Sequence, residues 1–282
     1  PVVVHVLTTK GKGYPPAEKN PEIFHGTEPF HIRTGKPRAR KRTLGCSEVM
    51  GLSLVQFGEK DKRIAAISAA MAAGTGLLPF AHRFPERFFD VGIAEGHALT
   101  FAAGLASQGM KPVVALYSTF LQRGYDQIVH DICLQNLPVV IAVDRAGLVG
   151  EDGPTHHGVF DLAFLRHVPN LVIMQPREGS EIPSFLAAAL ERKGPTVVRY
   201  PRGSSGLSRF RFHPHPVEIG RAEALREGAE GEIWALGPMV ETALSAAGIL
   251  AERKRSFGVV DARFVKPLDE ARLLSAARAG KP

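Results

Sequence analysis

The sequence predicts an α/β protein built on a doubly wound, mostly parallel sheet, followed by a smaller and incomplete α/β domain. From residue 43 onward, short apolar runs of strand length alternate with helical segments, a pattern typical of parallel strands joined by crossover helices. A stretch rich in Ser, Arg, His and Pro at 204–216 interrupts this alternation and indicates a linker. The alternation resumes after residue 217, but the chain ends before a second sheet is complete, so we expect a truncated domain there.

The individual elements follow from apolar periodicity and from the residues that begin and end each run. Strands are expected where apolar residues lie between turn residues, at 63–68, 88–93, 113–117, 139–143, 171–174 and 196–200. Helices are expected at 47–57, where Gly58 is expected to end the helix, and at 95–107, 124–135, 159–165 and 178–192. The second domain is expected to contain strands at 233–236 and 257–261 and helices at 239–250 and 268–277.

The residues before the first helix have a different character. Residues 2–7 are apolar and predict a buried strand, whereas the proline-rich residues 14–42 predict a loop and linker. A long ordered loop is uncommon unless it serves a site. The predicted organisation is therefore the end of a preceding domain with an active-site loop at 1–42, a main domain at 43–203, a linker at 204–216 and a second domain at 217–282.

Composition narrows the class of protein. With 44% hydrophobic and 22% charged residues in 282, the chain can bury a substantial core, and its longest apolar runs are too short to cross a bilayer. Neither a basic start nor a cleavage site surrounds residues 1–7, so we expect no signal peptide. Cys46 and Cys133 are far apart, which favours reduced thiols in a cytoplasmic protein.

The net charge of +7 raises the question of a polyanion partner. One short stretch supplies much of the excess, in the order Lys36, Arg38, Arg40, Lys41 and Arg42. We interpret this stretch as a solvated linker and expect no nucleic-acid partner, because no aromatic-rich strand pattern or zinc spacing accompanies it. A basic nucleic-acid-binding module remains an alternative. No Gly-rich phosphate loop, serine nucleophile elbow or CxxC pair points to nucleotide binding or to hydrolase chemistry.

Reactive side chains follow several of the predicted strands. Open parallel sheets bind ligands beyond the carboxyl ends of their strands, and the strand ends here carry Glu95, Tyr117, Arg145, Asp152 and Arg202. The loop at 150–158 holds two carboxylates, two imidazoles and three glycines, which favours proton transfer. The forked guanidinium groups of Arg145 and Arg202 suit a phosphate.

Each of these residues also has a purely structural interpretation. Glu95 begins a helix, where a carboxylate is favoured by the helix dipole. Either arginine could form a surface salt bridge, and Phe120 could belong to the core or could stack on a heteroaromatic ring. His156 and His157 are adjacent, and adjacent residues seldom chelate one ion well, so we expect no metal ligands among them.

Five segments occur in an order that resembles a known family. They are DVGIAEGHA (90–98), YSTFLQR (117–123), DRAG (144–147), DGPTH (152–156) and RYPRG (199–203). Together they resemble the pyrimidine-binding domain of the 1-deoxy-D-xylulose-5-phosphate synthases, a family of thiamine-diphosphate enzymes related to transketolase. Residues 261–269 (DARFVKPLD) resemble the start of that family's C-terminal domain, and residues 9–14 (TKGKGY) with Phe24 and His25 resemble the end of its N-terminal domain.

The resemblance implies a reaction and a role for each matching residue. The implied reaction is a decarboxylative carboligation of pyruvate with D-glyceraldehyde 3-phosphate, which gives 1-deoxy-D-xylulose 5-phosphate for isoprenoid, thiamine and pyridoxal synthesis. Glu95 would protonate the pyrimidine ring of the cofactor, Ile93 would hold the cofactor bent, Phe120 would stack on the pyrimidine and Arg123 would steady that loop. The remaining implied roles are diphosphate contact for Lys10, proton transfer and substrate binding for His156 and His25, and binding of glyceraldehyde 3-phosphate for Tyr117, Arg145, Asp152 and Arg202.

The chain departs from the family pattern at two places. Gly96 follows the glutamate where the family suggests Gln, and the Gly-Asp-Gly and Asn that bind Mg²⁺ and the diphosphate are missing, so these ligands are expected upstream of Pro1. Relatives are dimers, so a homodimer is expected. The rival interpretations are a transketolase or the decarboxylating subunit of a 2-oxoacid dehydrogenase, in which the pyrimidine half can be a separate chain.

Overall fold

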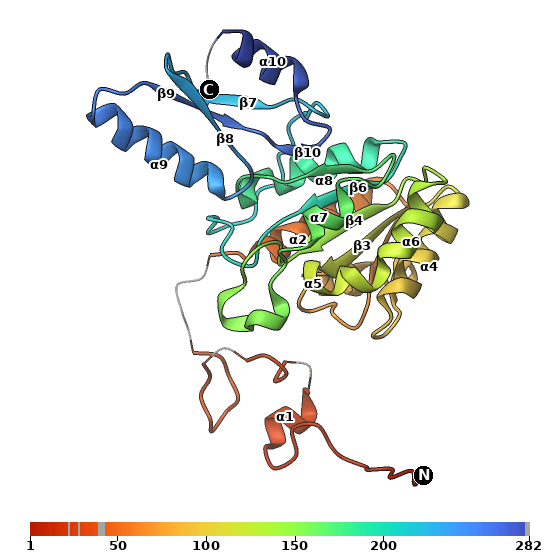
Figure 1. The fold of residues 1–282 in the computed structure, drawn as a ribbon. Coiled ribbons are helices and arrows are strands. Elements are labelled where there is room, and N and C mark those ends of the chain that lie inside the picture. Colours follow the sequence, from red (N-terminus) through yellow and green to blue (C-terminus); the bar gives the residue numbers. More distant parts are fainter. Residues whose placement is uncertain (22, 28, 39–42, 280–282) are drawn as a thin grey trace. The chain divides into compact units, whose positions relative to one another are not determined.

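The computed structural model describes residues 1–21, 23–27, 29–38 and 43–279 and divides the chain into two compact units (Figure 1). The first unit is Pro1–Arg42 and the second is Thr43–Pro282. The second unit holds both sheets and most of the expected site residues.

The described residues of the first unit form one short helix and an aromatic cluster. Helix α1 (Pro15–Lys19) begins after Tyr14, whose ring packs against Phe24 and Phe30 with centroids 5.5 and 5.8 Å away. The prediction of a buried strand at 2–7 is wrong, because these residues are exposed, with Val3 at 94%, and have no strand assignment. A strand must pair its backbone with a neighbour, and these residues have no ladder partner among the described residues of this unit.

A seven-stranded sheet forms the centre of the second unit, in the order β10-β5-β6-β4-β3-β1-β2. Its parallel strands are β1 (Ile64–Ser68), β2 (Phe88–Asp90), β3 (Lys111–Tyr117), β4 (Val140–Asp144), β5 (Val172–Met174) and β6 (Thr196–Arg199). Strand β10 (Phe264–Lys266) adds an antiparallel edge beside β5. The doubly wound, mostly parallel sheet expected from the sequence is therefore confirmed.

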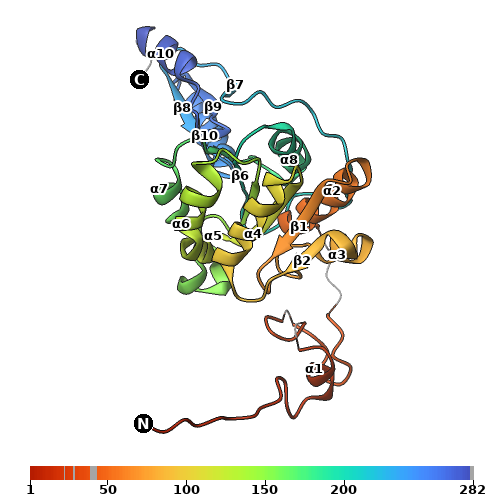
Figure 2. The ribbon, with the colours of Figure 1, turned by 90° about the vertical axis from the view of Figure 1, so that its right-hand side faces the viewer.

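Helices cover both faces of this sheet (Figures 1 and 2). One apolar layer joins the sheet to α2 (Cys46–Lys60), α3 (Leu78–Arg83) and α8 (Ile182–Glu191). The other joins it to α4 (Glu95–Ser107), α5 (Ser118–Leu121), α7 (Asp161–Leu165) and a π-helix at Ile128–Cys133 that continues α6 (Tyr125–Gln127). Strand side chains alternate between the two layers, as in β3, where Val113 and Ala115 face the first and Val114 and Leu116 the second.

Two helix predictions are corrected by this packing. Helix α2 continues through Gly58 to Lys60. A Cβ at Gly58 would lie 2.8 Å from the Phe80 ring and 2.9 Å from the Phe84 ring. Glycine there permits close packing and does not end the helix. The single helix expected at 124–135 is instead α6 and the π-helix, with a 3₁₀ turn at Gln122–Gly124 before them. Further 3₁₀ turns lie at Pro85–Arg87, Gly150–Asp152, Pro154–His156 and Gly179–Glu181.

The smaller sheet lies in the C-terminal part of the same unit. Its order is β7-β9-β8, with β8 (Gly231–Ala235) parallel to β9 (Phe257–Asp261) and β7 (Glu223–Arg226) antiparallel to β9. Helix α9 (Met239–Glu252) covers it through Ala243 and Ala247, and α10 (Glu270–Arg278) ends the described chain. The residues from Thr43 onward form one unit by their contacts, and the domain boundaries after residues 203 and 216 remain predictions. Of the helices in the described ranges, none combines the length and apolar composition that a membrane crossing requires.

Candidate active site at the carboxyl ends of the strands

The parallel strands bring most of the expected site residues to one edge of the large sheet. Strands β3, β4 and β6 are neighbours, so Tyr117, Asp144 and Tyr200 follow one another across this edge, at the ends of their strands or just beyond them. The register pairs Tyr117 with Asp144 directly. This edge is the place where open α/β sheets bind ligands.

Glu95 lies buried at the start of α4. It is 3% exposed, and its Oε2 accepts a hydrogen bond of 2.9 Å from Arg123 Nη1, which is the one charged partner recorded for it among the described residues. Ile93 precedes it in the turn after β2 and is 76% exposed. A buried carboxylate beside an exposed apolar side chain offers a ligand both a hydrogen-bonding group and a hydrophobic surface.

Three aromatic rings line the next part of the edge. The Phe120 ring stacks on Tyr117 with an interplanar angle of 14° and a centroid distance of 5.7 Å. The His156 ring meets Phe120 edge to face at 5.4 Å, and its Nδ1 lies 2.9 Å from the Thr155 hydroxyl. Burial raises the pKa of the Tyr117 hydroxyl, and the guanidinium of Arg145 opposes this shift. Phe120 thus lies at the strand-end site between Tyr117 and His156.

Arg145 is held tightly against this aromatic group. Its backbone is left-handed, with φ 57°, and its guanidinium carbon lies 3.9 Å from the centroid of the Tyr117 ring. Its Nη1 donates to the Gly74 carbonyl at 2.6 Å and to the Ser47 hydroxyl at 3.3 Å. The side chain of Arg145 is only 13% exposed, so its orientation is fixed before any ligand arrives.

Asp152 links the two arginines that were predicted to bind phosphate. Its Oδ2 lies 3.1 Å from Arg202 Nε and 3.8 Å from Arg145 Nε. Arg202 also donates to the Val149 carbonyl at 3.3 Å, and 35% of its side chain is exposed. The structure therefore brings Tyr117, Arg145, Asp152 and Arg202 together, although the role of each remains a prediction.

The loop that carries Asp152 and His156 is anchored to the sheet edge. Gly158 and Gly147 exchange backbone hydrogen bonds of 2.8 Å in each direction, which close the loop. A Cβ at Gly158 would lie 2.3 Å from the Arg145 carbonyl oxygen, so only glycine permits this approach. His157 Nδ1 accepts from the Val149 amide at 3.1 Å and thereby supports the loop.

Two expected site residues, Lys10 and His25, belong to the first unit. Both are exposed and lie in turns. Shortly after Lys10 in the chain, the backbone amide of Gly13 donates a hydrogen bond of 2.8 Å to Glu18 Oε1. Their proposed roles at the cofactor and the substrate remain predictions.

Sequence reasoning did not identify two contacts of this site, Ser47 and Gly74. Ser47 lies in the first turn of α2, and Gly74 lies in the loop after β1. A Cβ at Gly74 would lie 1.9 Å from the Tyr117 hydroxyl oxygen. The rule that ligands bind at strand ends, applied to the strand expected at 63–68, points to the loop that holds Gly74. No sequence signal distinguishes Ser47.

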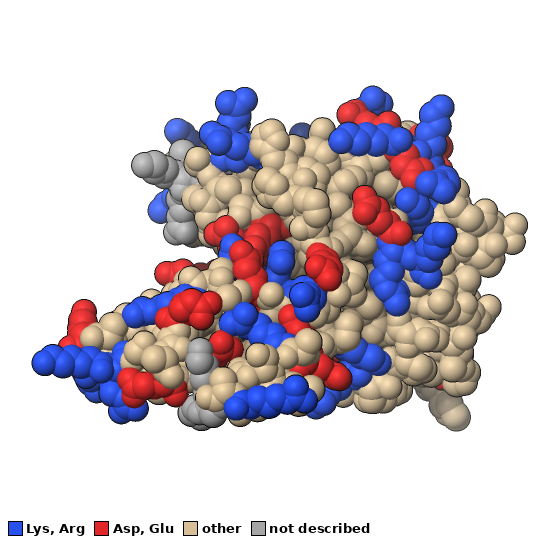
Figure 3. All heavy atoms as spheres, turned by 90° about the horizontal axis from the view of Figure 1, so that it is seen from above, with Lys and Arg blue, Asp and Glu red and all other residues tan. Residues whose placement is uncertain are grey.

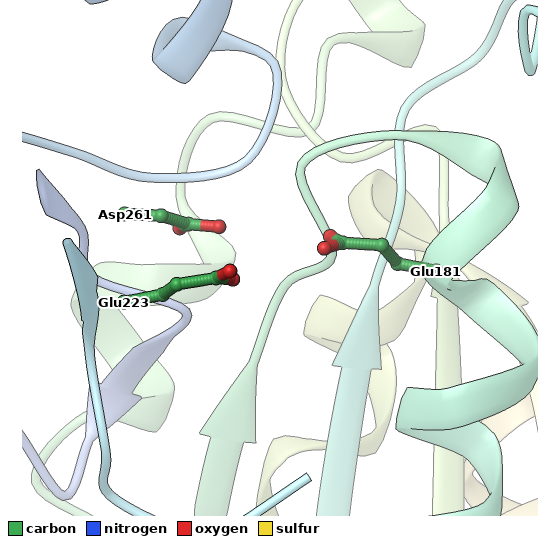
Figure 4. Close-up of side chains that lie close together, drawn as sticks. All are labelled: Glu181, Glu223 and Asp261. Atoms are coloured by element: carbon green, nitrogen blue, oxygen red, sulfur yellow. The ribbon is translucent and has the colours of Figure 1, made fainter. Parts of the chain in front are cut away.

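A second group of charges lies between the two sheets. Glu181, Glu223 and Asp261 place carboxylate oxygens within 4.8 Å of one another (Figure 4), and Arg177 forms ion pairs with all three at 3.2, 3.2 and 3.9 Å. Burial raises the pKa of Asp261 to about 6 and also raises that of Glu181. Because the guanidinium of Arg177 already neutralises part of this charge, we interpret the cluster as a structural ion-pair network.

The basic run predicted as a linker is only partly described. Lys36 and Arg38 are exposed, whereas Arg40, Lys41 and Arg42 lie outside the described residues. On the face drawn in Figure 3, Lys and Arg side chains are interspersed with Asp and Glu side chains, so the described residues seen there form no continuous basic surface.

The fold and the strand-end site together define a class of protein. A doubly wound sheet presents a buried carboxylate, an aromatic group and two arginines at one edge, which is the place where α/β domains of this kind bind ligands. Comparison with known proteins makes this class specific. The family model described as "Transketolase, pyrimidine binding domain" matches residues 42–206, and that described as "Transketolase, C-terminal domain" matches residues 220–281.

The chain belongs to the transketolase family. It is 59% identical over 278 residues to 1-deoxy-D-xylulose-5-phosphate synthase of Desulforudis audaxviator and 56% identical over 279 residues to that of Syntrophotalea carbinolica. Each alignment covers 99% of this chain but 44% of the relative, so the chain spans less than half the length of the curated relatives it matches.

Solved structures show the same fold. A structure titled "Split gene transketolase, inactive beta4 tetramer" matches with a TM-score of 0.74 and 34% identity, covering 84% of this chain and 77% of that one. A Pichia stipitis transketolase matches with a TM-score of 0.69 at 20% identity, covering 83% of this chain and 37% of that one, which shows the fold alone.

Proposed function

We propose that this chain supplies the pyrimidine-binding half of a thiamine-diphosphate carboligase that joins pyruvate to D-glyceraldehyde 3-phosphate. The products are 1-deoxy-D-xylulose 5-phosphate and carbon dioxide. The observation that carries the proposal is the strand-end site, where a buried Glu95 and the pair Arg145 and Arg202 lie at the same edge of the sheet. The 52–59% identity to proteins named 1-deoxy-D-xylulose-5-phosphate synthase supports the choice of substrates.

The residues present fit the pyrimidine half of the cofactor. Thiamine diphosphate, when bound, supplies a carbon nucleophile for attack on a keto group. We assign Glu95 the role of exchanging a proton with a ring nitrogen, because its carboxyl group is buried and the hydrogen bond from Arg123 orients its Oε2. Ile93 offers an exposed apolar surface and Phe120 an aromatic ring for stacking.

The fit does not extend to the metal and diphosphate. The one group of three candidate ligands among the described residues is Glu181, Glu223 and Asp261, and Arg177 already pairs with it. We therefore propose that Mg²⁺ and diphosphate ligands belong to the part of the enzyme that the relatives have and this chain does not cover, with Lys10 approaching the diphosphate.

The acceptor aldehyde suits the arginine pair. A phosphate dianion needs several N–H donors, and we assign this role to the guanidinium groups of Arg202 and Arg145. The side chain of Arg202 is 35% exposed, and the phosphate would compete with Asp152 and Glu151, which lie 3.1 and 3.8 Å from its guanidinium. Asp152 and Tyr117 offer hydrogen-bonding groups for the substrate hydroxyl and aldehyde oxygens. His156 on its loop, and His25, are proposed to assist in proton transfer.

The experiment is an assay of the full-length enzyme with pyruvate, glyceraldehyde 3-phosphate, thiamine diphosphate and Mg²⁺. We expect 1-deoxy-D-xylulose 5-phosphate and one carbon dioxide for each product molecule. Formation of sedoheptulose 7-phosphate from ketose donors would favour a transketolase, and acylation of a lipoyl domain would favour a 2-oxoacid dehydrogenase subunit. The absence of deoxyxylulose phosphate would refute the substrate assignment.

We also propose that the enzyme is a cytoplasmic homodimer. Large apolar side chains are exposed near the strand ends, with Ile93 at 76%, Leu148 at 75% and Phe160 at 61%, and a second copy would cover such a surface. Light scattering of the full-length enzyme should give twice the mass of one chain. A monomer at micromolar concentration would contradict this expectation.

A nucleic-acid-binding module is the alternative from another class. It predicts an affinity for DNA or RNA that falls steeply with salt concentration and that depends on the basic residues of 36–42. Tight binding at physiological salt, lost when those residues are replaced by Ser, would support the module and refute the linker interpretation.

A further inference from the structure

Asp144, the last residue of β4, is completely buried beneath the candidate active site. Its Oδ1 accepts a hydrogen bond of 2.7 Å from the backbone N–H of Arg145 and also lies 3.0 Å from Arg145 Nη1. One carboxylate oxygen therefore contacts both the main chain and the guanidinium of the next residue. This arrangement bends the arginine side chain back toward its own backbone.

The conformation of Arg145 depends on such a partner. A left-handed backbone with φ 57° is unfavourable for a bulky residue, and it persists only where surrounding contacts compensate for it. The guanidinium carbon lies 3.9 Å from the centroid of the Tyr117 ring, and Nη1 reaches the Gly74 carbonyl and the Ser47 hydroxyl. Without the carboxylate, this compensating contact is lost, and we expect the guanidinium to leave the Tyr117 ring.

The two charges also depend on each other. Arg145 is the cation paired with Asp144 among the described residues, and the other oxygen of Asp144, Oδ2, is buried without a hydrogen-bond partner. A buried carboxylate is costly unless a cation stays beside it, so the pair resists separation. Burial accordingly raises the pKa of Asp144, while Arg145 and Ser47 oppose the shift.

We propose that Asp144 is a positioning residue that fixes the guanidinium of Arg145 against Tyr117 and thereby sets the affinity for the phosphorylated acceptor. The choice of the phosphorylated acceptor rests on the proposed function, whereas the contact between Asp144 and Arg145 does not depend on it. Within the described residues, the hydrogen bond and the ion pair of Asp144 are with Arg145 and not with the proposed cofactor residue Glu95, so its effect should be confined to the acceptor.

The test compares two buried aspartates in the full-length enzyme, Asp144→Asn and Asp161→Asn. Asp161 is the matched control, because it is 1% exposed and forms a two-point ion pair with Arg199 at 2.7 and 3.0 Å, with no recorded contact to Arg145 or Arg202. We expect Asp144→Asn to raise the KM for glyceraldehyde 3-phosphate on the order of ten- to a hundred-fold, with a change of less than about three-fold in the pyruvate KM. Asp161→Asn should lower the thermal stability of the enzyme and should not raise the KM for glyceraldehyde 3-phosphate relative to the KM for pyruvate.

A milder variant covers the case in which Asp144→Asn does not fold. Ser47→Ala removes the hydroxyl that contacts Arg145 Nη1 from a half-buried position at the start of α2, and we expect a rise of about two- to five-fold in the acceptor KM. If Asp144→Asn folds and does not raise the acceptor KM beyond the value for Asp161→Asn, the proposal is wrong. If Asp144→Asn does not fold, an unchanged acceptor KM in Ser47→Ala refutes it.

A crystal structure of Asp144→Asn separates this proposal from the proposed function. We expect the guanidinium of Arg145 to leave the Tyr117 ring. If wild-type enzyme forms no deoxyxylulose phosphate, the proposed function fails, but the crystal structure still tests the positioning role. If Arg145 remains stacked on Tyr117 in the variant, Asp144 does not position it, whatever the substrate.

Discussion

Replacement of Gly74 by alanine should damage the acceptor site although it removes no charged group and no hydrogen-bonding group. A Cβ at this position would lie 1.9 Å from the Tyr117 hydroxyl oxygen and 3.0 Å from its ring carbon Cζ. Ordinary contact begins near 3.4 Å, so the hydroxyl must retreat by about 1.5 Å. The Tyr117 ring cannot retreat alone, because Arg145 lies on it at 3.9 Å and Phe120 stacks at 5.7 Å.

The size of the effect follows from this clash. Overpacking of a well-packed site typically costs about 1–3 kcal/mol, and a displacement of about 1 Å near a reacting centre can cost on the order of a hundred-fold in rate. We therefore expect Gly74→Ala to lower the apparent Tm of the full-length enzyme. We also expect it to raise the KM for glyceraldehyde 3-phosphate at least ten-fold, at roughly constant pyruvate KM.

A matched glycine provides the control. Gly248 lies in helix α9, and a Cβ there would meet nothing within 4 Å. Gly248→Ala should therefore stabilise the protein by about 0.5–1 kcal/mol through helix propensity and leave both KM values unchanged. Thermal unfolding and steady-state kinetics of the two variants test the reasoning. A Gly74→Ala enzyme with wild-type Tm and acceptor KM would refute it.

Three further predictions concern Glu95, Arg202 and Asp261. Glu95→Gln should lose turnover by on the order of 10²–10⁴-fold while thiamine diphosphate still binds in calorimetry, and near-native turnover would contradict the proton-holding role. Arg202→Met should raise the acceptor KM about 10- to 100-fold, and a larger rise in the pyruvate KM would show that the assignment is wrong. Burial raises the pKa of Asp261 to about 6 in the folded protein, so its carboxyl group loses the proton at a lower pH in the unfolded chain than in the folded one. The free energy of unfolding should therefore fall as the pH rises from about 4 to 6. Asp261→Asn should remove this loss and be more stable than wild type at pH 8, by at most about 3 kcal/mol, with a smaller difference at pH 4, and an equal difference at both pH values would contradict it.

The strand order shows where sequence reasoning stops. The sequence indicates a parallel sheet because apolar runs alternate with helices, and helix Glu95–Ser107 and strand Phe257–Asp261 have the expected bounds. It gives no sign that β10, which follows the smaller sheet in the chain, joins the large sheet beside β5. Periodicity reports which face of a segment is buried, whereas pairing between distant segments depends on the packing of the whole unit.

The candidate site divides in the same way. Glu95, Tyr117, Arg145 and Arg202 could be found from the sequence, because strand ends are local features and parallel strands bring their ends to one edge. The contacts that orient them, from Ser47 and Gly74 to Arg145, join residues 98 and 71 positions apart. No local pattern encodes such a contact.

The sequence by itself thus determined the class of fold and the chemical groups at the edge of the sheet, since both depend on short-range patterns of apolar and polar residues. The tertiary structure alone decided which of these groups touch. It placed Arg145 on Tyr117 and Asp152 between the two arginines, and it left residues 2–7 exposed where the pattern predicted a buried strand. The physical reason is that burial and pairing require a partner, and the partner's position is fixed by long-range packing.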